Sequence, residues 1–309
     1  MRIVFMGTPD FSVPCLQRLI ADGEEVVGVF TQPDKPKGRG YELTPPPVKV
    51  EALKHNIPVF QPKSMRDGEA LKILETLQPD LSVVVAYGKI LPPEILYFPK
   101  YNSINIHASI LPKYRGAAPI QWVILNGEKK TGVTSMQMDD GIDTGDMLLK
   151  AELPISPNMT GGELHDALSS LGAQVLSDTL NALKNGDLHP TKQTGESNYA
   201  PMLNKALCPI DFSRTAQEVH NHVRGLSPFP TATAVLHGKR LKIHTTRLTE
   251  NISTAPAGTI VSVTDEIEVA CGDGKTVMIT ELQPEGKKRM PAKAFLVGHK
   301  LQAGEAFEG

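Results

Sequence analysis

The stretch R-I-V-F-M-G-T-P-D-F-S-V-P occupies residues 2–14 and decides the fold of the first part of the chain. Its apolar run, Ile3–Met6, is typical of a strand that is buried on both faces of a parallel sheet. The turn that follows offers Asp10 or Ser12 as the cap of a helix. Because a second apolar run occupies 26–30, we predict a Rossmann-like α/β domain with a doubly wound, mostly parallel sheet.

The glycine pattern of this first turn argues against a dinucleotide cofactor. Gly7 stands alone and is followed by Thr8 and Pro9, so the G-x-G-x-x-G fingerprint is missing. That fingerprint lets the backbone approach a pyrophosphate, and its absence disfavours a nicotinamide or flavin cofactor.

Length and composition favour a protein of two domains. The chain has 309 residues, of which 40% are hydrophobic, and a formal net charge of −2. Its three cysteines are too few for a disulfide framework or a metal cluster, and no stretch approaches the about 18 consecutive apolar residues of a membrane span. We therefore expect a cytoplasmic protein without a metal.

The character of the sequence changes after residue 184. Residues 185–205 are mostly polar and contain glycine and proline, which is typical of an interdomain linker. Beyond Thr231, five or six short runs alternate apolar and polar residues between glycine-containing turns. We predict a first domain at 1–184 and a small all-β barrel at 206–309.

The segment S-I-N-I-H-A-S-I-L-P, residues 103–112, is the first candidate for a functional site. Its period of two places Asn105 and His107 on the same face of a strand, where both side chains can address one small-molecule atom. A single Asn or His in a strand is more often a satisfied structural residue, so this pattern alone leaves both interpretations open.

A carboxylate further along the chain makes the catalytic interpretation stronger. Asp143 lies between Gly141 and Gly145, which permit a tight loop that returns over the strand. A carboxamide, an imidazole and a carboxylate are suited to acyl transfer, because they hold a developing oxyanion and orient the imidazole. No G-x-S-x-G elbow accompanies Ser109, which favours direct transfer without a covalent enzyme intermediate.

Two clusters of basic residues are candidates for binding phosphates. The first is the stretch 31–49, where prolines and glycines argue against regular structure, and it contains Lys35, Lys37 and Arg39. The second is the cluster Lys287, Lys288, Arg289 and Lys293. For both, the alternative is a solvated surface.

The sequence resembles the folate-dependent formyltransferases, most closely those members that act on initiator methionyl-tRNA. The resemblance is carried by N-I-H-A-S-I-L-P-K-Y-R-G-A-A-P-I-Q-W, D-D-G-I-D-T-G-D, G-T-P-D-F-S-V-P and K-P-K-G-R-G, and it extends over essentially the whole chain. It implies that the C-terminal barrel is of the oligonucleotide-binding (OB) type. It also implies 10-formyltetrahydrofolate as co-substrate and a monomeric enzyme.

The resemblance also implies roles for individual residues. The catalytic trio would be Asn105, His107 and Asp143. Folate would contact two loops, through Tyr87, Gly88, Leu91, Ser109, Ile110, Leu111 and Pro112. The tRNA would contact the basic stretch, with Arg39 at the position of the family's key arginine, and we expect further contacts from Lys287, Lys288 and Arg289.

Two alternative functions remain open from the sequence. A formyltransferase that acts on a small amine, such as glycinamide ribonucleotide or an aminosugar, would share the trio. A nucleic-acid-binding protein without catalysis would keep the basic clusters while the trio served only the structure.

Overall fold

The computed structural model describes residues 1–37 and 42–308, and it divides into two compact units. Unit 1 comprises 1–116, 131–153 and 165–199, and unit 2 comprises 117–130, 154–164 and 200–309. Two segments that the sequence assigns to the first domain, 117–130 and 154–164, therefore make their contacts within unit 2. The predicted division into a first domain at 1–184, a linker at 185–205 and a second domain at 206–309 remains a proposal.

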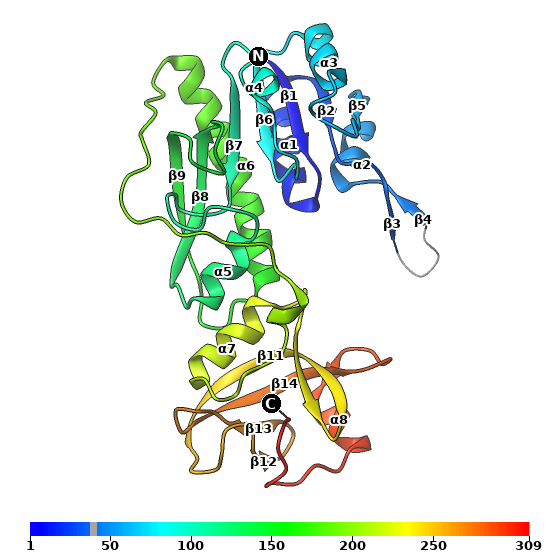
Figure 1. Ribbon diagram of the computed structural model, residues 1–309, viewed down its shortest axis with the longest axis vertical. Coiled ribbons are helices and arrows are strands. Elements are labelled where there is room, and N and C mark those ends of the chain that lie inside the picture. The colour runs from blue at the N-terminus through cyan, green and yellow to red at the C-terminus, as the bar shows by residue number, and fades with distance from the viewer. Residues whose placement is uncertain (38–41, 309) are drawn as a thin grey trace. The chain divides into compact units, whose positions relative to one another are not determined.

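Among the described residues, unit 1 is built on a sheet of seven strands in the order β5-β2-β1-β6-β7-β8-β9 (Figure 1). Their bounds are β1 (Arg2–Gly7), β2 (Glu25–Phe30), β5 (Val59–Phe60), β6 (Leu81–Val85), β7 (Ser103–His107), β8 (Lys130–Gln137) and β9 (Met147–Pro154). Along this order, neighbouring strands from β5 through β2, β1 and β6 to β7 pair in parallel. Strand β8 pairs with β7 in the antiparallel direction. The predicted doubly wound, mostly parallel sheet is confirmed.

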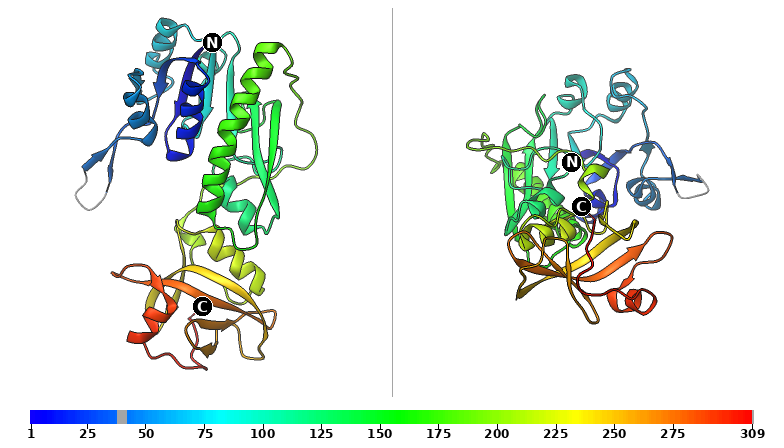
Figure 2. Two further views of the ribbon diagram at one scale, coloured as in Figure 1. Left: turned by 180° about the vertical axis from the view of Figure 1, so that it is seen from behind. Right: turned by 60° about the horizontal axis from the view of Figure 1, so that its bottom comes forward.

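Helices cover both faces of this sheet. They are α1 (Val13–Ala21), α2 (Pro47–Lys54), α3 (Glu69–Leu77), α4 (Pro93–Leu96) and α6 (Gly161–Asn185). Val4 and Met6 of β1 pack in one hydrophobic cluster with Leu74 of α3. On the opposite face, Gly172 of α6 lies against Ile106 of β7, and α1 lies beside α6 in the view from behind (Figure 2). Side chains alternate between the two faces along each strand, so both faces of the sheet are apolar and each is covered by helices.

The basic stretch 31–49 has more regular structure than its composition predicted. Strand β3 (Lys35–Lys37) pairs in the antiparallel direction with β4 (Glu42–Thr44), and α2 begins at Pro47. The prediction of an irregular stretch was wrong here, because proline is tolerated in an isolated ribbon and at the first turn of a helix. Arg39 lies outside the described residues.

The expected linker is likewise more ordered than its composition predicted. Thr191 exchanges both backbone hydrogen bonds with Met147, each at 2.8 Å, so the chain beyond α6 packs against the edge of the unit 1 sheet. A polar, proline-containing segment can pair in this way because its backbone N–H and C=O groups remain available whatever its side chains.

The described part of unit 2 contains a six-stranded sheet of which the main path runs in the order β10-β11-β14-β13-β12, with β15 paired to β14. These strands are β10 (Ala232–Leu236), β11 (Lys239–Ile252), β12 (Ile260–Val263), β13 (Ile267–Ala270), β14 (Lys275–Pro284) and β15 (Met290–Pro291). The helices are α5 (Pro119–Leu125), α7 (Ala216–Gly225) and α8 (Ala292–Gly298), with a 3-10 turn η2 (Lys205–Leu207). The neighbouring strands on this path pair in the antiparallel direction, as an OB-like domain requires.

The C-terminal segment links the two edges of this sheet. Glu308 forms a bridge with Val235 of β10, and Ala306 forms one with Thr259 beside β12. Between them, Phe307 is 6% exposed and stacks on Phe212 with ring centroids 5.3 Å apart. The strands alone leave the sheet open, and the segment 305–308 supplies partners for both of its edges.

We expect Phe307→Ala to destabilise unit 2 by about 3–5 kcal/mol, because it removes a buried aromatic ring from the closing segment. Urea unfolding followed by the fluorescence of Trp122, the single tryptophan of the chain, reports on unit 2. Ile252→Ala is the control, since Ile252 is 82% exposed. Equal unfolding midpoints for both variants would show that the segment does not hold the sheet.

Candidate active site

The pairing of β7 with β8 explains how the three candidate catalytic residues meet. Ile104 pairs with Gln137, and His107 pairs with Thr134. Because the strands are antiparallel, the loop 138–146 leaves β8 beside the start of β7 and must fold back to reach His107. That return path carries Asp143 over the face that presents Asn105.

The three side chains converge on the carboxylate of Asp143. Asn105 Nδ2 donates to Asp143 Oδ1 at 3.3 Å, and His107 Nδ1 lies 3.6 Å from Asp143 Oδ2. The backbone N–H of Gly116 donates to the same Oδ2 at 2.8 Å. The structure therefore brings the predicted trio together, while the catalytic role of each residue stays a prediction.

The His107 ring is held between two oxygen atoms of the protein. His107 is 6% exposed, and its Nε2 lies 2.9 Å from the carbonyl oxygen of Tyr114. Both ring nitrogens thus face oxygen atoms of the protein. In this arrangement His107 can donate to a substrate oxygen only by exchanging one of these two contacts.

The loop that carries Asp143 depends on its own local geometry. Asp139 Oδ1 accepts hydrogen bonds from Thr144 Oγ1 at 2.7 Å and from the N–H of Gly141 at 3.1 Å. Asp143 has φ +54, in the left-handed region that few non-glycine residues adopt. A Cβ on Gly145 would lie 1.7 Å from the carbonyl oxygen of Gln137, so no side chain fits there. The predicted need for glycine around Asp143 is met.

The segment expected to be a linker supports this loop. Gln193 Nε2 donates to the carbonyl oxygens of Asp143 and Gly145, each at 2.8 Å, and its Oε1 accepts from Arg115 Nη2 at 2.7 Å. Asn198 Oδ1 accepts from the N–H of Tyr114. Sequence reasoning missed Gln193 and Asn198, because polar residues in a proline- and glycine-containing stretch give no local sign of such contacts.

Several of the residues that were predicted to contact folate make contacts within the protein instead. Tyr87 and Leu91 belong to the hydrophobic core, and burial raises the pKa of Tyr87. Ser109 Oγ donates to the carbonyl oxygen of Lys113 at 2.7 Å, and Leu111 is buried. Of the predicted set, Gly88, Ile110 and Pro112 keep surface exposure. Folate binding by these two loops stays a prediction.

The residues predicted to contact tRNA differ in how far their charge is offset by a partner within the protein. Lys35, Lys287 and Lys288 are exposed. Arg289 is also exposed, but it forms an ion pair with Glu281, and this pairing lowers the pKa of the Glu281 carboxyl. The charge of Arg289 is therefore partly offset within the protein, and the two neighbouring lysines are the stronger candidates for phosphate contacts.

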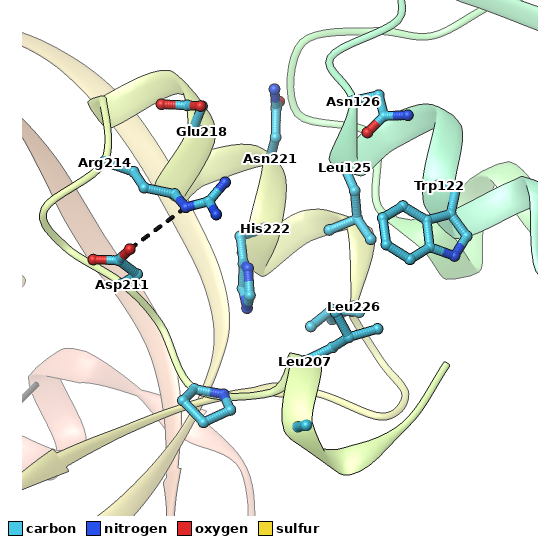
Figure 3. Close-up of a pocket in the computed structure, with 12 residues that line it drawn as sticks. Trp122, Leu125, Asn126, Leu207, Asp211, Arg214, Glu218, Asn221, His222 and Leu226 are labelled. Carbon is cyan, nitrogen blue, oxygen red and sulfur yellow. Dashed lines mark ion pairs between the residues drawn. The ribbon is translucent and has the colours of Figure 1, made fainter. Parts of the chain in front are cut away.

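Unit 2 contains a cavity of about 630 Å³ that does not include the trio (Figure 3). Trp122 of α5, His222 of α7 and Leu207 of η2 are among its lining residues. Burial lowers the pKa of His222, which disfavours its charged form. The described residues include no cluster of His, Cys, Asp or Glu that could hold a metal ion, and none of their helices meets the length and hydropathy of a membrane span.

Comparisons with known proteins agree with the fold. The formyl transferase family matches residues 1–180, and the formyl transferase C-terminal domain matches residues 202–300. A methionyl-tRNA formyltransferase from Citrifermentans bemidjiense is 53% identical over 305 residues, which covers 98% of this chain and 95% of the relative. One from Bacillus subtilis is 50% identical over 306 residues, covering 98% and 96%.

Solved structures share the fold at lower identity. An N-formyltransferase from Helicobacter canadensis, crystallised with folinic acid and dTDP-3-aminofucose, has a TM-score of 0.70 at 22% identity, over 92% of this chain and 99% of that one. HypX from Aquifex aeolicus with tetrahydrofolic acid has a TM-score of 0.63 at 19% identity, over 96% and 47%.

The chain therefore belongs to the formyl transferase family, a family of one-carbon transferases. Within that family, the relatives that it matches at about half identity along nearly its full length are methionyl-tRNA formyltransferases.

We expect Gly145→Ala to lower formyl transfer about 100-fold, because the clash with the Gln137 carbonyl displaces the Asp143 loop by an ångström or more. Initial rates and circular dichroism should be measured together, so that loss of activity is separated from loss of fold. Gly298→Ala is the matched control, since a Cβ there meets nothing within 4 Å. Unchanged turnover in Gly145→Ala would contradict the tight-loop geometry.

Proposed function

We propose that this chain transfers the formyl group of 10-formyltetrahydrofolate to the α-amino group of initiator methionyl-tRNA. The observation that carries the proposal is the convergence of Asn105, His107 and Asp143 in a chain that matches methionyl-tRNA formyltransferases over 98% of its length. We further propose a monomer in the bacterial cytosol.

The reaction requires one C–N bond to form and another to break. The amine of methionyl-tRNA attacks the formyl carbon, and the carbonyl oxygen gains negative charge. Asn105 directs one N–H to Asp143 and has a second N–H, which is the donor for that oxygen. The amine then loses a proton, the folate nitrogen gains one, and the bond between that nitrogen and the formyl carbon breaks. Asp143 and His107 are the groups placed to relay the proton.

The state of Ser109 supports direct transfer. Its hydroxyl is buried and donates to the carbonyl oxygen of Lys113 at 2.7 Å. A nucleophilic serine needs an adjacent general base, and this hydroxyl is instead committed to a backbone acceptor. A covalent enzyme intermediate is therefore not part of the proposal.

The two alternative functions are less well supported. A sugar N-formyltransferase such as that of Helicobacter canadensis shares the fold at 22% identity, whereas the methionyl-tRNA formyltransferases share about half of all residues. A binding protein without catalysis would have no need for the left-handed Asp143 and its converging donors, since such backbone strain is retained where the site requires it.

We expect Asn105→Ala to lower kcat by about 10²- to 10³-fold with little change in Met-tRNA affinity, because one oxyanion donor is lost. The assay follows labelled formyl from 10-formyltetrahydrofolate to Met-tRNA, with glycinamide ribonucleotide and an aminosugar nucleotide as competing acceptors. The exposed residue Asn158 provides the control variant Asn158→Ala. Near-normal turnover in Asn105→Ala, or preferred transfer to a small amine, would overturn the proposal.

We expect Lys287→Gln with Lys288→Gln to weaken Met-tRNA binding and leave folate binding unchanged. Each lost phosphate contact should flatten the dependence of log affinity on log salt by about 0.7–0.9. Filter binding at several salt concentrations measures this slope. Lys72→Gln, at an exposed position of α3, is the control. If the double variant keeps the wild-type slope, these lysines face solvent without a partner.

A further inference from the structure

A group of three polar side chains holds the base of the β3–β4 ribbon. Lys49 Nζ donates to both carboxylate oxygens of Asp34 at 2.9 Å and to Gln61 Oε1 at 2.8 Å. Asp34 immediately precedes β3, and Lys49 lies in α2, which follows β4. The ion pair therefore joins the two ends of the ribbon that carries Lys35.

Gln61 connects this group to the loop after β2. Its Nε2 donates to Asp34 Oδ1 and to the carbonyl oxygen of Gln32, both at 2.8 Å. The hydrogen bond from Gln61 and the charge of Lys49 lower the pKa of Asp34, so the carboxylate stays ionised. Gln61 therefore joins the ribbon base to the backbone of Gln32.

Gln32 in turn contacts the loop after β6. Its Nε2 donates to the carbonyl oxygens of Gly88 at 3.0 Å and Tyr87 at 3.3 Å. Thr8 Oγ1 also donates to the carbonyl oxygen of Tyr87 at 2.9 Å and accepts from the N–H of Gln32 at 3.2 Å. Lys89 Nζ donates to the carbonyl oxygens of Pro62 and Lys63, the latter at 2.7 Å, and so joins the loops after β5 and β6 directly.

The sheet order explains why these loops meet. Strands β5, β2, β1 and β6 are neighbours and parallel, so the loops after them emerge side by side at one edge. Gln61, Gln32, Thr8 and Tyr87 each lie in one of these loops. A continuous row of hydrogen bonds thus runs from the base of the basic ribbon to a loop in which folate contacts are predicted.

We propose that Gln61 and Gln32 are positioning residues that couple the two substrates, so that folate bound at the Tyr87–Gly88 loop strengthens binding of Met-tRNA at the β3–β4 ribbon, and the reverse. Coupling between two ligands is reciprocal, because both bias the same arrangement of the connecting groups. This inference rests on the proposed function. It adds a role for two residues that need not contact either substrate.

The test measures a coupling factor, the ratio of Met-tRNA dissociation constants without and with saturating 5-formyltetrahydrofolate. This folate is used as a non-transferring probe, and the full-length protein is used throughout. We expect a factor of about 5 or more in the wild type, at the lower end of typical coupling. In Gln61→Ala the factor should fall to one, and in Gln32→Ala, which keeps the contacts of Lys89, it should fall towards one.

The two variants interrupt the row at different points. Gln61→Ala leaves the Lys49–Asp34 ion pair in place, and Gln32→Ala leaves the whole ribbon base in place. Binding of the probe alone should change less than twofold in both. Gln174→Ala, an exposed glutamine of α6, should keep the wild-type factor.

A merely structural role would lower thermal stability or the affinity for Met-tRNA alone without changing the coupling factor. An unchanged factor in both variants, or a factor of one in the wild type, would overturn the inference. Formylation of Met-tRNA by the wild type is measured in parallel. If that reaction proceeds while the factor is one, the coupling alone is refuted; if it does not proceed, the proposed function fails.

Discussion

The arrangement of the site depends on the sharing of one carboxylate, that of Asp143, among donors from separate segments of unit 1. Oδ1 accepts from Asn105, while Oδ2 accepts from the N–H of Gly116 and lies at ion-pair distance from His107. A partly buried carboxylate costs free energy when its oxygens lack partners. Strand β7, the loop after it and the loop after β8 are therefore held in one mutual arrangement.

This arrangement is maintained against local backbone strain. Asp143 and Tyr114 both adopt positive φ without being glycine, which costs on the order of 1–3 kcal/mol at each position. Hydrogen bonds from Gln193 and Asn198 offset the strain by holding the backbone of the Asp143 loop and of Tyr114. The segment 191–199, which the composition marked as a linker, is thus part of the support of the site.

Local patterns predicted much of the fold. The apolar runs of β1 and β2 and the alternation in unit 2 each depend on neighbouring residues alone, and the structure confirms them. The β3–β4 ribbon was missed because proline and glycine lower local propensity, whereas its pairing is a contact between segments. The closing role of residues 305–308 was missed for the same reason, since it requires two distant strand edges.

For the site, the sequence by itself determined which residue types are present and that Asn105 and His107 share a face, because the period of a strand is local. It also placed glycines around Asp143, without which the loop cannot pass the Gln137 carbonyl. Only the tertiary structure decided that Asp143 reaches both residues, that His107 faces two acceptors, and that Gln61 and Gln32 connect two loops. These are contacts between segments far apart in the chain, and no local pattern specifies them.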